Sequence, residues 1–301
     1  MEKSNRIVFY DQIARNKRNS VFLIISILLV FVILGYVIGM ALGPDYFLII
    51  MIASIVISIF YVWFGYYNSD KIAIASVRGK IADSINHRAL LNSVESMALA
   101  SGLPMPRVYI MPGEQINAFA SGRDPKHAVL CFTEGAISKL NKQELEGVVA
   151  HEMAHINNYD IRFMTLTAVL VGMIAIISEI FLRSLFFGVG KDRESKAQLV
   201  FILIGILLAI LAPIVVYLVQ LAISRKREFT ADATAVKFIR SPTGLINALE
   251  KIGNDSSHFK NREVSKAIAP LFIANPFKGK FKGLTSTHPP LEKRIEILKK
   301  M

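Results

Sequence analysis

Two long apolar runs near the start of the chain restrict what it can fold into. They cover residues 21–42 and 46–66 and are separated only by Gly43, Pro44 and Asp45. As helices that rise about 1.5 Å per residue, both are long enough to cross about 30 Å of hydrocarbon. The first run is too long for the apolar core of a cleaved leader, and no small-residue cleavage pattern closes it. We therefore predict an N-terminal transmembrane hairpin.

A second pair of apolar runs covers residues 163–182 and 199–223. The third run carries Glu179 near its end, where an acid can reach the interface, and Pro213 in the fourth is expected to kink its helix. With 53% hydrophobic residues, the whole chain is too apolar for an ordinary soluble domain. The sequence thus predicts a mainly α membrane protein with four transmembrane helices in two hairpins.

Lysine and arginine gather on one side of these runs. They precede the first run, recur through residues 68–162 and follow the fourth run at residues 225–227, whereas the turn at residues 43–45 has none. Because cytosolic loops carry the excess of basic residues, we expect both termini and residues 68–162 in the cytosol. The loop at residues 183–198 is also basic, so the second hairpin is predicted to cross the membrane fully or only in part.

The formal charge of +12 and the pI of about 9.7 favour an acidic partner. The basic residues are scattered and concentrated beside the apolar runs, without a recognisable nucleic-acid-binding module. Anionic lipid headgroups are therefore the expected partner, and nucleic acid is not. The single cysteine, Cys131, cannot form a disulfide within the chain and lies in an apolar stretch, so we expect it to pack in a core.

The part of the chain outside the hairpins is predicted to be mainly helical with a small β-sheet. One helix is expected at residues 80–101, and strands are expected at residues 108–111, 116–120 and 128–133. Residues 254–285 are rich in Lys, Gly and Ser, and the sequence favours neither a substrate-facing loop nor a simple linker for them.

The pattern H-E-x-x-H occurs at His151, Glu152 and His155. It lies in a predicted helix, residues 141–158, in which Asn141 is a plausible N-cap and Glu144 follows it with capping-box spacing. Positions i and i+4 share a helix face, so both imidazoles can bind one metal ion, and Glu152 lies where a carboxylate can take a proton from a bound water. The arrangement is typical of zinc peptidases, although five residues alone also match ordinary helix surface.

A zinc site with two histidines needs a third protein ligand. Glu228 and Asp232 lie one helical turn apart, just after the fourth apolar run, and face the same way. Glu228 is the predicted ligand, and Asp232 is expected to accept a hydrogen bond from the free ring nitrogen of a ligand histidine. The competing interpretation is a solvated acidic pair beside the basic residues 225–227. Both halves of the site then lie close to the cytosolic membrane surface. This position favours membrane-associated substrates and argues against a protease whose site lies within the membrane.

Further motifs follow one another along nearly the whole chain. They are residues 87–91 (HRALL), 100–106 (ASGLPMP), 117–120 (NAFA), 151–155 (HEMAH), 228–232 (EFTAD) and 286–290 (STHPP), followed by Arg294 and Ile295. With these motifs in this order, the chain resembles the HtpX family of membrane-bound zinc metalloproteases, which are relatives of the CAAX prenyl proteases.

The resemblance implies a role for each matching residue. His151, His155 and Glu228 would bind one Zn²⁺ per chain, Glu152 would be the general base and Asp232 would orient a ligand. His288 would face the cleft and stabilise the oxyanion. The fold would be an α+β zincin-like (gluzincin) catalytic domain, in which an extended substrate pairs with an edge strand formed by Asn117, Ala118, Phe119 and Ala120.

The implied function is that of a zinc metalloendopeptidase in the bacterial inner membrane, which cleaves membrane or misfolded proteins on the cytosolic side in quality control and stress response. The chain would divide into a hairpin (residues 1–67), the first part of the catalytic domain (68–162), a second hairpin (163–223) and the second part of the domain (224–301). Its partners would be protein substrates and the bilayer.

Three alternatives remain open from the sequence. A prenyl-type CAAX protease shares the catalytic logic, but those relatives carry more membrane spans. A non-catalytic zinc-binding scaffold has no need of Glu152. A transporter is expected to show paired, interrupted spans, which this chain lacks.

Overall fold

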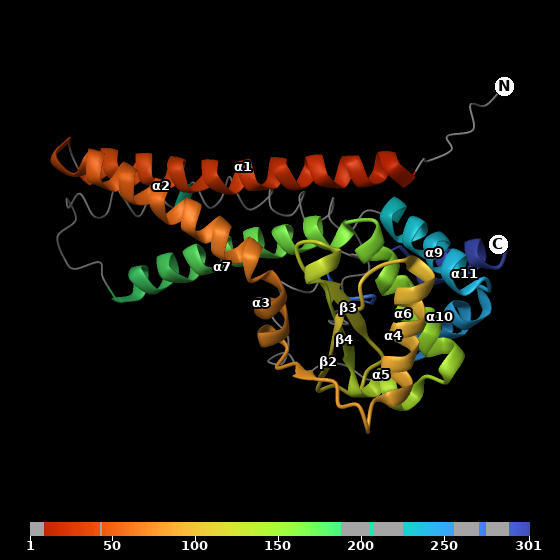
Figure 1. The fold of residues 1–301 in the computed structure, drawn as a ribbon. Coiled ribbons are helices and arrows are strands. Elements are labelled where there is room, and N and C mark those ends of the chain that lie inside the picture. The colour runs from red at the N-terminus through yellow and green to blue at the C-terminus, as the bar shows by residue number, and fades with distance from the viewer. Residues whose placement is uncertain (1–8, 43, 188–204, 207–224, 256–270, 275–288) are drawn as a thin grey trace.

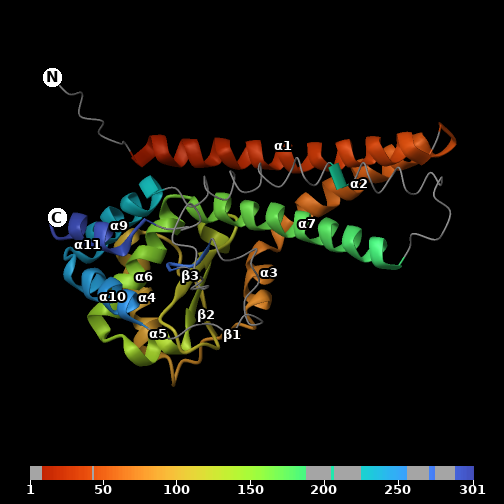
Figure 2. The ribbon, with the colours of Figure 1, turned by 180° about the vertical axis from the view of Figure 1, so that it is seen from behind.

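The computed structural model describes residues 9–42, 44–187, 205–206, 225–255, 271–274 and 289–301. Three long helices extend to one side of a smaller body that contains the sheet (Figure 1). They are α1 (Phe9–Leu42), α2 (Pro44–Tyr67) and α7 (Asp160–Phe187). Seen from behind in Figure 2, the start of α1 again lies close to α9 (Arg225–Ile239) in the body.

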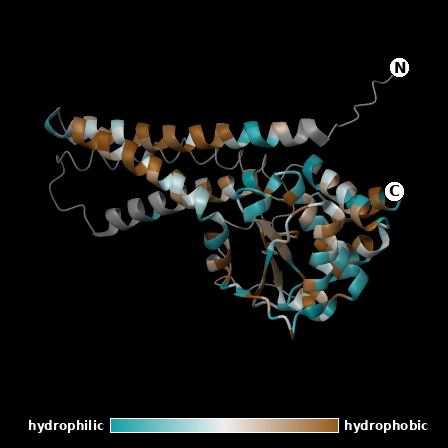
Figure 3. Cartoon of the chain, viewed as in Figure 1, coloured by the Kyte–Doolittle hydropathy of each residue, from teal (hydrophilic) through white to brown (hydrophobic). Residues whose placement is uncertain are grey.

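Helices α1 and α2 fold back on each other with small residues at their contact. A Cβ atom on Gly35 would lie 2.3 Å from the hydroxyl oxygen of Ser54, so the two backbones approach closely there. Among the described residues, two helical segments are long and apolar enough to cross a membrane, Asn16–Met40 and Pro44–Tyr67. Figure 3 shows how apolar both are along their length. The second segment contains the whole second predicted run, and the first contains residues 21–40 of the first run.

Helix α7 begins in the body and packs beside the hairpin. Phe163 lies in one apolar cluster with Ile27 of α1, and the Tyr61 hydroxyl of α2 donates a hydrogen bond of 2.9 Å to the Val169 carbonyl. The third predicted run therefore lies within one helix that contacts both others. The fourth run lies outside the described residues except for two positions, so the number of four membrane helices stays a prediction.

The sheet has four strands in the order β1-β2-β4-β3. The central pair, β2 and β4, is parallel, and both outer pairs are antiparallel. The three predicted strands are confirmed to within two residues at either end. The strands are β1 (Lys80–Ile81), β2 (Arg107–Met111), β3 (Ala118–Ser121) and β4 (Val129–Thr133).

The predicted helix at residues 80–101 is wrong over its first part. Residues 80–81 form β1, and α4 (Arg88–Ser101) begins only seven residues later. The Asp83 carboxylate accepts a hydrogen bond of 2.9 Å from the Ile85 amide, which favours a turn over a helix. Since β1 also pairs with β2, contacts with a distant strand override the local helical pattern.

Helices cover both faces of the sheet (Figure 1). Helix α3 (Ser69–Ser76) packs on one face, and α4 and α6 (Lys142–Asn157) form the main core on the other. A Cβ atom on Gly147 would lie 2.5 Å from the Leu245 amide nitrogen, so the backbones of α6 and α10 (Thr243–Asn254) approach each other closely. The remaining helices are η1 (Pro125–His127), α5 (Glu134–Lys139) and α11 (Leu291–Leu298).

Candidate active site

Helix α6, which carries the H-E-x-x-H pattern, begins as the sequence predicts. The Asn141 side chain accepts a hydrogen bond of 2.9 Å from the Glu144 amide, and the Glu144 carboxylate accepts one of 2.8 Å from the Asn141 amide. Lys251 of α10 also donates to Glu144 at 2.7 Å. The capping box and the helix are thus confirmed, and they fix the register that turns His151 and Glu152 into the body.

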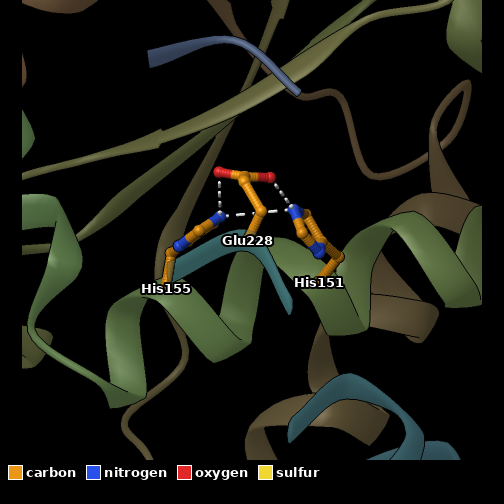
Figure 4. Close-up of side chains that lie close together, drawn as sticks. All are labelled: His151, His155 and Glu228. Carbon is orange, nitrogen blue, oxygen red and sulfur yellow. Dashed lines mark hydrogen bonds and ion pairs between the residues drawn. The ribbon is translucent and has the colours of Figure 1, made fainter. Parts of the chain in front are cut away.

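The three predicted metal ligands meet between α6 and α9. The Nε2 atoms of His151 and His155 lie 3.2 Å apart. The Glu228 carboxylate oxygens lie 3.5 Å from Nε2 of His151 and 3.7 Å from Nε2 of His155. In Figure 4 the carboxylate from α9 faces both rings from α6. All three side chains are buried, so Glu228 is not part of a solvated acidic pair.

These spacings suit a bound metal ion. Zinc holds nitrogen and oxygen ligands about 2.0–2.2 Å away, so neighbouring ligand atoms in a tetrahedral site are about 3.3–3.6 Å apart. One ligand atom from each of His151, His155 and Glu228 lies within 4.8 Å of the other two. Two imidazoles and one carboxylate are also a donor set of catalytic zinc sites, which keep a fourth position open.

Glu152 lies buried beside the three ligands with one carboxylate oxygen unused. Its Oε1 atom has no hydrogen-bond partner within the described part of the chain, and the side chain is 1% exposed. Burial raises the pKa of Glu152, and the neighbouring His151 and His155 offset this only in part. A carboxylate with a raised pKa can both accept a proton and return it near neutral pH.

Asp232 lies where the sequence predicts, behind His151. Its Oδ1 atom is 3.0 Å from Nδ1 of His151, so the Nδ1–H group donates a hydrogen bond to the carboxylate. The Nε2 lone pair is then left for a metal. Burial and Arg294 lower the pKa of His151, but hydrogen bonds to Asp232 and Glu228 outweigh them and raise it to about 9. Burial raises the pKa of Asp232, yet Arg294 and His151 bring the net shift below the usual value.

Arg294 of α11 joins this site, and the sequence indicated no role for it. Its Nε atom lies 2.9 Å from Oδ2 of Asp232, and its Nη2 atom lies 2.6 Å from Oδ1. Its Nη1 atom also lies 3.3 Å from Oε2 of Glu228. Arg294 is fully buried, so it neutralises acids that would otherwise repel each other in the core. Its position four residues after the STHPP segment was the only signal in the sequence.

Asp160 is a second residue that the sequence analysis missed. Its Oδ2 atom lies 2.9 Å from Nδ1 of His155, so each ligand histidine has its own carboxylate. Asp160 is the first residue of α7 and is fully buried. The signal was an acid five residues after His155, at the entrance to an apolar run.

The predicted substrate edge is covered by the chain itself. Phe272 forms an antiparallel bridge with Phe119 of β3, and the two rings are 5.1 Å apart. The Ile273 amide donates a hydrogen bond of 2.9 Å to the Ala118 carbonyl. Asn117, just before the strand, donates from its side chain to the Ala274 carbonyl at 3.0 Å. Residues 271–274 therefore add a further short segment to the sheet beyond β3.

His288 lies outside the described residues, although Pro289 next to it is buried. Cys131 is fully buried in β4, which confirms the expected core position, and burial raises the pKa of its thiol.

Comparisons with known proteins identify relatives of this chain. Residues 84–301 match peptidase family M48. A protein from Caldanaerobacter subterraneus subsp. tengcongensis named "Protease HtpX homolog" is 43% identical over 97% of this chain and 97% of its own length. A protein of the same name from Listeria monocytogenes serotype 4a is 39% identical over 98% of this chain and 100% of its own length.

A solved structure supports the fold. The crystal structure of S. mikatae Ste24p aligns with 91% of this chain at a TM-score of 0.53 and 20% sequence identity. The aligned part is 61% of that protein, so this chain spans less than two thirds of its length.

Proposed function

This chain belongs to peptidase family M48, and from that membership we propose that it is a zinc-dependent endopeptidase that cleaves membrane or misfolded proteins on the cytosolic side of a bacterial inner membrane. That it is a membrane-bound metalloprotease of the HtpX type follows from the family and from relatives that match over nearly their full length. The metal, the roles of the residues, the substrates and the orientation are the proposed part.

One observation carries the proposal. The unused Oε1 atom of Glu152 is buried next to three side chains with metal-ligand spacing. A buried carboxylate oxygen without a hydrogen bond costs free energy. A purely structural zinc site would not need such a carboxylate beside its ligands. A water molecule bound for hydrolysis would satisfy it.

The chain's own residues account for the proton transfers. Zinc, when bound, supplies a Lewis acid that polarises the scissile carbonyl and lowers the pKa of a nearby water. Glu152 takes the proton from the attacking water and passes it to the leaving amine. Asp232 keeps the His151 ring in the required tautomer and orientation. We assign oxyanion stabilisation to His288 from the matching STHPP segment.

The substrate is proposed to bind as an added strand on β3. An extended peptide would then take the position of residues 271–274, which pair with the same edge. Binding therefore requires this segment to leave β3. Because the edge is lined by Asn117, Ala118, Phe119 and Ala120, apolar stretches of unfolded or membrane proteins are the fitting substrates.

The membrane arrangement is proposed on the same basis. Two described helices can span a bilayer, and α7 packs on them. With the fourth apolar run as a partner for α7, the catalytic domain would form from residues 68–162 and 224–301, interrupted by the second hairpin. Both parts and both termini would lie in the cytosol, where basic residues flank the runs.

Glu152→Gln in the detergent-purified full-length protein tests the proposal. The variant should keep about one zinc per chain by elemental analysis and lose about 10²–10⁴-fold in casein cleavage, because the amide cannot accept the proton. Glu146→Gln, the same exchange on the same helix but with a partly exposed side chain, is the matched control and should behave as wild type.

The outcomes separate the alternatives. Cleavage by Glu152→Gln at the wild-type rate would refute the base assignment. A wild-type protein that holds zinc but cleaves nothing would favour the scaffold. Cleavage confined to prenylated C-terminal peptides would favour a CAAX-type protease.

A further inference from the structure

Asn16 is a buried polar residue at the start of the first membrane-spanning segment. The segment begins at Asn16, and this side chain is only 3% exposed. A polar side chain at such a position is costly unless it finds partners. Its hydrogen-bond partners lie in the catalytic body, more than 140 residues later in the sequence.

The Asn16 amide uses both its donor and its acceptor. Nδ2 donates to Oδ1 of Asp160 at 2.6 Å and to the Asn158 carbonyl at 3.0 Å. Oδ1 accepts a hydrogen bond of 3.2 Å from Nη2 of Arg227. Arg227 in turn places its Nε atom 3.0 Å from the same Oδ1 of Asp160. Three elements, α1, α7 and α9, are joined through these contacts.

The Asp160 carboxylate links this cluster to the metal site. One oxygen is held by Asn16 and Arg227, and the other accepts the Nδ1 proton of His155 at 2.9 Å. Holding the first oxygen fixes the plane of the carboxylate and so the direction in which His155 is held. Hydrogen bonds of this kind set the orientation and basicity of a ligand histidine.

We propose that Asn16 is a positioning residue for His155, so that the first membrane helix completes the metal site through Asp160. The inference rests on the proposed zinc-dependent function. It assigns α1 a role beyond anchoring: the site reaches full metal affinity only when α1 is docked on the body. An enzyme built in this way is assembled for catalysis only together with its membrane hairpin.

Asn16→Ala in the full-length protein, purified in detergent, removes the amide without adding bulk. Ser20→Ala is the matched control, because Ser20 is buried one turn later on α1 and donates only to the Asn16 carbonyl of its own helix. Zinc affinity is measured by competition with a chromogenic chelator, and the geometry of the site by the absorption spectrum of the Co²⁺-loaded protein.

Asn16→Ala should lower zinc affinity about tenfold, the lower end for outer partners of a ligand, and alter the Co²⁺ spectrum. Ser20→Ala should leave both unchanged. At limiting zinc, the Asn16→Ala kcat should fall while KM stays constant, and added zinc should restore kcat. A residue that only stabilised the fold would not give this pattern.

A double-mutant cycle with Asp160→Asn shows whether Asn16 acts through Asp160. Asp160→Asn alone should lower zinc affinity about 10–100-fold, and adding Asn16→Ala should then change little. Full additivity, or wild-type zinc affinity in Asn16→Ala, would overturn the inference. If Asn16→Ala does not fold, Asn16→Leu, which keeps the branching and the number of side-chain heavy atoms, takes its place in the same cycle. Absence of zinc from the wild-type protein would instead refute the proposed function.

Discussion

Arg294 and Asp232 form a two-point ion pair beneath the metal site, with nitrogen–oxygen distances of 2.9 and 2.6 Å. Because Asp232 also holds His151, a residue of the last helix takes part in orienting this predicted ligand of α6. The C-terminal end of the chain is therefore part of the candidate active site.

The geometry of this pair predicts that lysine can replace Arg294 only in part. Arg294→Ala should destabilise the protein by about 3–5 kcal/mol, because it leaves buried acids without their partner. Arg294→Lys keeps the charge but loses the planar two-point contact, so its stability and zinc affinity should fall between those of Arg294→Ala and wild type. Thermal unfolding measures the stability, and chelator competition measures the zinc affinity. The control Lys293→Ala, at the exposed neighbouring position, should change neither. Equal behaviour of the lysine variant and wild type would contradict the prediction.

Zinc affinity should depend steeply on pH. The pKa of His151 without metal is about 9, whereas zinc needs the neutral ring, so one proton must leave below that pH. Apparent affinity should rise about tenfold per pH unit from pH 7 and level off near pH 9. Competition with a chelator at fixed ionic strength tests this. A flat profile over this range would show that His151 is already neutral.

The same pKa shift affects the zinc-free protein in the opposite direction. A raised pKa stabilises the folded state fully below the unfolded value of about 6.5, and the contribution is lost as pH rises through about 9. The melting temperature of the zinc-free protein should therefore decrease over this interval. Asp232→Asn, which removes a carboxylate that raises the pKa, should weaken this decrease.

Locking residues 271–274 onto β3 should block proteolysis. Phe119 and Phe272 face each other across an antiparallel bridge, so the pair Phe119→Cys and Phe272→Cys should form a disulfide. Cys131 on β4 lies opposite Phe119 on β3, so it is first replaced by alanine to prevent a wrong disulfide. The oxidised protein should be inactive and the reduced protein active in the same preparation. Undiminished cleavage by the oxidised form would place substrate binding elsewhere.

Cysteine labelling can establish the orientation in the membrane. Wild-type protein should stay unlabelled, because its only thiol, Cys131, is buried. Asp45→Cys, at the exposed start of α2, should react with an impermeant maleimide on intact cells. Lys142→Cys, at the exposed start of α6, should react only after the cells are permeabilised. The reverse pattern would invert the proposed topology.

The parts of the site that the sequence predicted are those whose residues lie a few positions apart in the chain. His151, Glu152 and His155 lie within one capped helix, and Glu228 and Asp232 within another, so helical periodicity placed each group correctly. Arg294 could not be assigned in this way, because it meets His151 across 143 positions. The same holds for Asn16, whose partners follow from how α1 docks.

The fold shows the same limit. The apolar runs and the strands at residues 107–111 and 129–133 follow from local pattern. Residues 80–81 were misassigned because pairing with β2, not local preference, decides their conformation. The bridge between Phe119 and Phe272 likewise joins segments that carry no mutual signal in the sequence.

Helix α1 is unbroken over 34 residues, about 50 Å at 1.5 Å per residue, and so is longer than the bilayer core is thick. A rod of this length adapts to a thinner membrane by tilting. The start of its apolar segment holds the Asp160 carboxylate through Asn16, so a tilt of α1 is expected to act on the contact beside His155. We therefore expect the thickness of the surrounding lipid to affect the geometry of the candidate metal site.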